Sequence, residues 1–116
     1  MKKRTKILTI ANRKGGAGKS TSAAHIALEA VSSGLKTLVI DLDPQKTLET
    51  WWKKRGSENP ALTDIDSTQI EELQDKVSKH GFDICIIDTP GDTSPHAINA
   101  LKVADLVLLM IDGSYG

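Results

Sequence analysis

The sequence predicts an α/β fold, a mostly parallel sheet with flanking helices, on two observations. Short runs of strand length alternate along the chain with segments whose apolar residues recur at helical spacing. Several of these runs are apolar throughout instead of alternating with polar residues, which is typical of strands covered on both faces. Connections between parallel strands are right-handed. We therefore expect a single α/β domain with helices on both faces of its sheet.

The first half of the chain is predicted to contain two strands and two helices. A β-rich run at 6–11 is followed by a glycine-rich loop and then by a helix at 20–33, whose apolar residues fall three and four apart. Gly34 stands where the end of a helix favours a left-handed residue. A second strand is expected at 37–40 and a second helix at 46–55.

The second half repeats this alternation. We expect a short edge strand at 61–66, a helix at 67–79 that Gly81 ends, a strand at 82–87, a helix at 94–103 and a last strand at 106–111. The apolar residues of the last strand indicate a buried position. Because the sequence ends just beyond it, an exposed place at the edge of the sheet remains the alternative.

Composition excludes several classes of protein. The chain has 116 residues, 39% of them hydrophobic, with 15 Lys and Arg against 15 Asp and Glu. No apolar run approaches the roughly 20 residues that span a bilayer, and the apolar run at 7–11 is too short for a signal peptide. The lone Cys85 is expected to be a small core residue. These features predict a cytoplasmic protein.

Charge is divided unevenly along the chain. Residues 1–55 hold 12 Lys and Arg against 4 Asp and Glu, whereas residues 56–116 hold 3 against 11. The first half is therefore the part suited to an anionic ligand, and the alternative is a pair of oppositely charged surfaces that attract each other on folding.

Polar segments follow three of the predicted strands, at 13–21, 41–45 and 88–91. Ligands of open α/β sheets bind at the carboxyl ends of the strands. Glycine residues in the first segment let backbone N–H groups turn toward an oxyanion, and the helix that follows presents its free amides and positive dipole end. This combination predicts a phosphate-binding loop.

The loop departs from the P-loop pattern G-x-x-x-x-G-K-[ST] at one position, because Arg13 stands where the pattern has its first glycine. The rest of the pattern is present. Lys19 is expected to contact the β- and γ-phosphates, Ser20 to coordinate Mg²⁺ and Thr21 to donate to the α-phosphate.

Three segments together resemble the ParA/MinD family of ATPases. The run Lys14–Thr21 resembles the family's deviant Walker A motif, in which a second, signature lysine stands early in the loop. Asp41–Gln45 resembles the first switch, and Phe82–Gly91 resembles the Walker B strand with the second switch. The sequence Asp-Leu-Asp-Pro-Gln favours the partition ParA proteins within the family. The resemblance extends from about Lys6 to Ile111.

The resemblance implies roles for individual residues. Ser20 would bind Mg²⁺ directly, Asp88 would reach the ion through a water and Asp41 would support the metal site. The catalytic residues would be Lys14, Lys19 and Asp43. Lys14 would cross the interface of an ATP-bound dimer, and Asp43 would position the attacking water. The nucleotide would be bound by Lys14, Gly15, Gly16, Ala17, Gly18, Lys19, Ser20, Thr21 and Gly91, with Gly91 sensing the γ-phosphate.

The resemblance also implies cofactors and partners. ATP and Mg²⁺ would be the cofactors, and the partners would be a second copy in an ATP-dependent homodimer and a ParB-like, centromere-binding adaptor that stimulates hydrolysis. Full-length members bind nonspecific DNA and associate with the nucleoid, through basic residues that lie beyond the part matched here. No membrane partner is expected.

Members of the family continue past the strand equivalent to 106–111, so we expect residues 1–116 to form the amino-terminal portion of the nucleotide-binding P-loop ATPase domain, shortened at its carboxyl end. A first alternative is therefore a truncated nucleotide-binding or interaction module with weak or no catalysis. A second alternative, a small-metabolite synthetase of the same superfamily, is disfavoured by Asp41–Gln45.

Other conspicuous residues are given structural roles. Trp51 and Trp52 are expected to place one ring in the core and one at the surface, in preference to base stacking or a dimer interface. His25 lies on the helix after the loop and is interpreted as structural. The basic amino-terminal residues are interpreted as a solvated terminus rather than as a DNA contact.

Overall fold

The computed structural model describes residues 4–12, 19–65, 67–90 and 95–110. Its centre is a five-stranded parallel sheet in the order β3-β2-β4-β1-β5. The strands are β1 (Lys6–Asn12), β2 (Thr37–Asp41), β3 (Ala61–Thr63), β4 (Ile84–Asp88) and β5 (Leu106–Met110). The helices are α1 (Lys19–Ser32), α2 (Thr47–Arg55), the 3₁₀ helix η1 (Ser67–Glu72), α3 (Leu73–Lys79) and α4 (Pro95–Val103).

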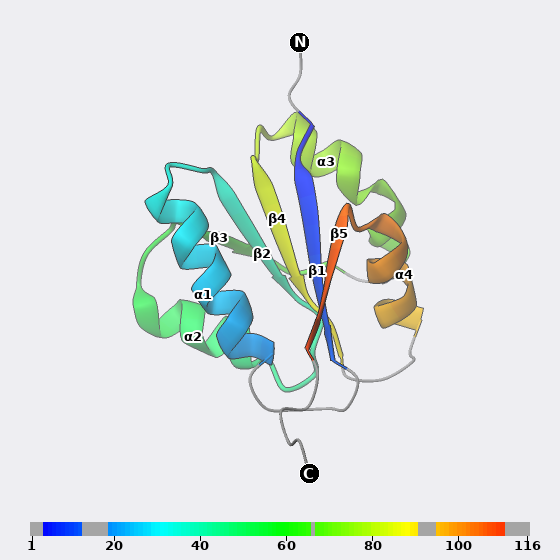
Figure 1. The fold of residues 1–116 in the computed structure, drawn as a ribbon, viewed down its shortest axis with the longest axis horizontal. Helices are drawn as coiled ribbons and strands as arrows, with labels where there is room; N and C mark the ends of the chain where they lie inside the picture. The colour runs from blue at the N-terminus through cyan, green and yellow to red at the C-terminus, as the bar shows by residue number, and fades with distance from the viewer. Residues whose placement is uncertain (1–3, 13–18, 66, 91–94, 111–116) are drawn as a thin grey trace.

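Helices cover both faces of the sheet (Figure 1). Helices α1 and α2 lie on one face, and α3 and α4 lie on the other. The prediction of a mostly parallel sheet with flanking helices is confirmed, as are the strand and helix order. No helix within the described ranges is long and apolar enough to cross a bilayer.

Two apolar cores explain why the central strands are apolar throughout. Alternate residues of a strand point to opposite faces. Ile40 and Ile87 accordingly belong to the core under α3 and α4, whereas Val39 and Ile86 belong to the core under α1 and α2. All four are fully buried. Cys85 is also fully buried, and burial raises the pKa of its thiol to about 12, so it is a core residue as predicted.

Glycine ends two helices as the sequence predicts. Gly34 follows α1 with φ 83° and Gly81 follows α3 with φ 77°. Both angles lie in the left-handed region, where a side chain is disfavoured. Each glycine reverses the chain so that the next strand enters the sheet.

One predicted helix is two elements in the structure. The segment expected as a single helix at 67–79 begins as the 3₁₀ helix η1 and becomes α-helical only at Leu73. Residues three apart eclipse each other in a 3₁₀ helix. This geometry suits Ile70 and Leu73, which are both buried against the sheet, and Val77 follows one α-helical turn later.

The last strand is exposed, so the prediction of a buried position is wrong and its alternative is confirmed. β5 pairs with β1 on one side, and no other strand of the described residues pairs with its other side. Leu106 is 65% exposed and Leu109 is 52% exposed. Apolar content predicts a strand, whereas the exposure of that strand depends on which neighbours the described part of the chain supplies.

The two tryptophans also differ from expectation. Neither is fully buried or fully exposed, and both pack against the core under α1 and α2. The indole N–H of Trp52 donates to the carbonyl oxygen of Pro60 at 2.7 Å. The guanidinium of Arg55 lies 5.9 Å from the centre of the Trp51 ring. Both side chains therefore stabilise the packing of α2 and the loop before β3.

We expect buried residues of the central strands to contribute more to the free energy of unfolding than exposed residues of β5. Replacing the fully buried Ile40 by alanine should lower the free energy of unfolding by about 2–5 kcal/mol, because it leaves a cavity between β2 and α3. Replacing Leu106 by alanine should change it by about 0.5 kcal/mol or less. Urea unfolding followed by circular dichroism measures both. Equal losses in the two variants would contradict the assigned strand order.

Candidate nucleotide-binding site

The carboxyl ends of β2 and β4 bring two acidic residues together. Asp41 and Asp88 are the last residues of their strands and are aligned with each other across the β2–β4 pair. Asp88 is also aligned with Ile10 of β1, because β4 lies between the two other strands. Asp41 is 1% exposed and Asp88 is fully buried. The predicted meeting of these two residues at one edge of the sheet is confirmed.

Both carboxylates lie on the face of the sheet that α1 and α2 cover. Ile40 and Ile87, the residues before them, belong to the opposite core, and the alternation of a strand turns the next side chain to the other face. Helix α1 begins on that face at Lys19, directly after the glycine-rich loop. The amino end of α1 and the acidic pair therefore share one face at one edge of the sheet (Figure 1).

Asp41 organises the loop that follows β2. One of its carboxylate oxygens accepts a hydrogen bond from the backbone N–H of Asp43 at 3.1 Å, and the other accepts from the N–H of Glu49 at 3.0 Å. Asp43 in turn accepts from the N–H of Gln45 at 2.9 Å. These bonds tie the loop to the first turn of α2 and hold Asp43 half-buried beside the acidic pair.

Lys46 completes this loop and was not singled out by the sequence analysis. Its backbone is left-handed, with φ 54°, which is uncommon for a residue with a side chain. Its ammonium group donates to the carbonyl oxygen of Asp41 at 2.7 Å and lies 3.7 Å from the carboxylate of Asp64. A lysine next to a helix start carries no distinctive sequence signal, so only the folded loop shows this contact.

Burial raises the pKa of Asp41 above its usual range. The hydrogen bonds from the backbone N–H groups of Glu49 and Asp43 lower this pKa in part. The neighbouring Asp88 carboxylate raises the pKa further, and the charge of Lys46 lowers it. Two adjacent buried carboxylates repel each other when both are ionised. A divalent cation beside them relieves that repulsion, and hard cations such as Mg²⁺ prefer oxygen ligands.

The chemistry of the acidic pair therefore fits Mg²⁺ as a partner. The described residues contain no group of three or more His, Cys, Asp or Glu side chains that could hold a metal ion. A metal at this edge would accordingly need ligands besides the acidic pair. The hydroxyl of Ser20, phosphate oxygens and water are the oxygen donors expected there.

Thr89 fixes the chain as it leaves β4. Its hydroxyl and its backbone N–H both donate to the carbonyl oxygen of Ile10, at 2.8 and 3.2 Å. The side chain is 1% exposed. The segment that leads from Asp88 toward Gly91 is thereby held against the end of β1, from which the glycine-rich loop departs.

Part of the predicted site lies outside the described residues, namely Arg13, Lys14, Gly15, Gly16, Ala17, Gly18 and Gly91. The backbones of Lys19 and Ser20 open α1. Thr21 lies in the first turn of α1, and its exposed side chain lines a cavity of about 270 Å³ together with Trp51 of α2. The roles assigned to these residues remain predictions.

The fold and this edge of the sheet define a nucleotide-binding α/β protein of the P-loop class. Residues 8–113 match the family model described as the CobQ/CobB/MinD/ParA nucleotide binding domain. The chain therefore belongs to this family, whose ParA/MinD members are P-loop ATPases, as the sequence motifs indicated.

Individual relatives include partition proteins. The chain is 30% identical to a ParA protein of Rhizobium radiobacter. The alignment covers 89% of this chain and 47% of the ParA protein. It is 24% identical to the chromosome-partitioning ATPase Soj of Thermus thermophilus. That alignment covers 99% of this chain and 58% of Soj. A plasmid partition protein of Borrelia burgdorferi B31 bound to AMPPNP superposes with a TM-score of 0.66 at 29% identity, over 92% and 62% of the two chains. The chain thus spans about half the length of the curated relatives it matches.

We expect Asp41 to be needed for the loop even without nucleotide. Replacing it by alanine should lower the free energy of unfolding by about 1–3 kcal/mol, because two part-buried N–H groups lose their acceptor. Replacing the exposed Asp64 by alanine should cost about 0.5 kcal/mol or less. Urea unfolding in nucleotide-free buffer distinguishes the two. An Asp41→Ala chain as stable as the original would contradict this arrangement.

Proposed function

We propose that this chain provides the phosphate-binding part of a ParA-like ATPase that binds Mg-ATP and acts in plasmid or chromosome partitioning. The observation that carries the proposal is the buried pair of Asp41 and Asp88, set at the carboxyl edge of the sheet on the face where α1 begins. Membership in the family and the likeness to a partition protein bound to AMPPNP support it.

Phosphoryl transfer requires placement of the reacting groups and neutralisation of charge more than covalent chemistry. In the proposed site, the loop amides and Lys19 hold the phosphates, while Ser20, Asp41 and Asp88 hold Mg²⁺ directly or through water. The ion, when bound, neutralises the negative charge of the phosphates. Asp43, half-buried next to Asp41 in the loop after β2, orients the attacking water.

Further steps follow from the family resemblance. Lys14 contacts the phosphates of a partner copy, so ATP promotes a homodimer, and Gly91 senses the γ-phosphate. Dimers bind nonspecific DNA at the nucleoid, and a ParB-like adaptor stimulates hydrolysis. The alternative is a nucleotide-binding or interaction module that hydrolyses ATP weakly or not at all.

Titration calorimetry with Mg-ATP tests the binding step. We expect saturable binding to the chain and a dissociation constant at least about 100-fold weaker in Lys19→Ala, because the loop loses its phosphate-contacting cation. Lys54→Ala, which changes an exposed lysine on α2, should bind as the original does. GTP as a competitor reports base preference. No binding by a chain that circular dichroism shows to be folded would overturn the proposal.

A hydrolysis assay separates the ATPase from the binding module. We expect Asp43→Ala to retain ATP affinity within about threefold and to lose at least about 100-fold in turnover, since the residue acts on the attacking water and not on the phosphates. Phosphate release at saturating Mg-ATP measures this. If the original chain binds ATP but its turnover already equals that of Asp43→Ala, the module without hydrolysis is the correct description.

A further inference from the structure

Lys46 bonds to both ends and to the middle of the loop that joins β2 to α2. Its ammonium group donates to the carbonyl oxygen of Asp41, at the end of β2, at 2.7 Å. Its backbone N–H donates to the carbonyl oxygen of Asp43 at 3.0 Å. Its own carbonyl oxygen accepts from the backbone N–H and the hydroxyl of Thr50 in α2, at 3.0 and 2.9 Å. One residue therefore joins the end of β2, Asp43 and the start of α2.

The backbone of Lys46 is held in an uncommon conformation. Its φ is 54° and its ψ is 34°, in the left-handed region that a residue with a side chain seldom adopts. Such a conformation persists only where the surrounding contacts hold it, and it is found most often at active sites and switch segments. Although Lys46 precedes α2, its side chain makes no capping bond to the helix and bonds to Asp41 instead. The side chain thus serves the loop.

The bond from Lys46 fixes the peptide group at which the loop leaves the sheet. The N–H of Leu42 donates to the carbonyl oxygen of Asp88 in β4 at 2.8 Å. The N–H and C=O groups of a trans peptide point in opposite directions, so the carbonyl oxygen of Asp41 points away from β4 and toward β3. β4 therefore holds one side of this peptide group, and Lys46 holds the other.

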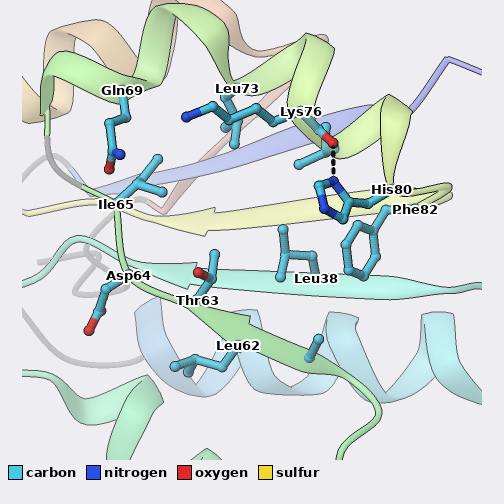
Figure 2. Close-up of a pocket in the computed structure, with 12 residues that line it drawn as sticks. Leu38, Leu62, Thr63, Asp64, Ile65, Gln69, Leu73, Lys76, His80 and Phe82 are labelled. Atoms are coloured by element: carbon cyan, nitrogen blue, oxygen red, sulfur yellow. Dashed lines mark hydrogen bonds between the residues drawn. The ribbon is translucent and has the colours of Figure 1, made fainter.

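Asp64, directly after β3, is the other neighbour of the Lys46 ammonium group. The two charged groups are 3.7 Å apart, and their side chains are 43% and 66% exposed. Figure 2 shows Asp64 at one end of a cavity of about 410 Å³ between β3, β2 and α3, with its carboxylate directed away from the helix. An ion pair as exposed as this one contributes little. The bond to Asp41 is therefore the contact that gives the Lys46 side chain its structural effect.

We propose that Lys46 is a positioning residue for ATP hydrolysis, because it holds in place the loop that carries Asp43. This role rests on the proposed function, in which Asp43 orients the attacking water. The N–H of Asp43 also donates to the Asp41 carboxylate, so two contacts with Asp41 place the loop. Exact placement of a group that acts on the nucleophile changes the rate of reaction more than the affinity for substrate. Lys46 acts through Asp43 and not on the nucleotide.

Steady-state kinetics of ATP hydrolysis test this role. Lys46→Met removes the ammonium group and keeps a long side chain. We expect it to lower kcat at least about tenfold and to leave KM for ATP within about threefold, because Asp43 loses its placement and the phosphate-binding loop is unchanged. Two controls should keep kcat within about twofold. Lys53→Met makes the same change on α2, at a lysine 3.7 Å from Glu49, and Asp64→Ala removes only the ion pair.

A glycine variant separates placement from stability. Glycine adopts a φ of 54° without strain, so Lys46→Gly should unfold at close to the same urea concentration as the original chain. It lacks the side chain that bonds to Asp41, so its kcat should fall as in Lys46→Met. A kcat close to the original in either variant would overturn the proposal.

Exchange of backbone amides with water, measured by NMR on the ¹⁵N-labelled chain, needs no nucleotide. Lys46→Met should speed exchange at Asp43 and Gln45 at least about threefold and leave Ile86 in β4 unchanged. Unchanged exchange at Asp43 and Gln45 would overturn the role of Lys46 whether or not the chain hydrolyses ATP. If the original chain shows no turnover while Lys46→Met speeds exchange, Lys46 does hold the loop and the proposed ATPase alone is contradicted.

Discussion

The parallel register of β4 between β1 and β2 is the constraint on which the rest of this structure depends. It aligns Asp88 with Ile10 on one side and with Asp41 on the other. A shift of one residue would turn Asp88 toward the opposite face and bury it among the apolar residues under α3 and α4. The two cores on either face of the sheet therefore also determine where the acidic residues lie.

Asp41 has a structural role and a chemical one. Its two oxygens hold the loop after β2 to α2, and its burial beside Asp88 makes the pair a favourable neighbour for a cation. Lys46 reaches from this loop to Asp64, at the end of the cavity beside β3. The acidic edge and the cavity thus share one network of polar contacts, although different residues line them.

The two ends of the sheet contrast with each other. At β3 the side chains facing α3 are small, and a cavity of about 410 Å³ lies between β3 and the helix. At β5 the side chains are large and exposed, with Leu106 and Leu109 both more than half exposed. Terminal strands with exposed apolar residues favour pairing with other chains.

The sequence by itself determined the local features: the order of strands and helices, the glycines at Gly34 and Gly81 and the acidic residues that end β2 and β4. Periodicity and backbone preference are properties of neighbouring residues, so they can be recognised without a fold. The 3₁₀ start of the segment at 67–79, the exposure of β5, the left-handed Lys46 and the cavity at β3 were decided only by the tertiary structure. Each depends on strand order or on packing between residues far apart in sequence, which no local pattern records.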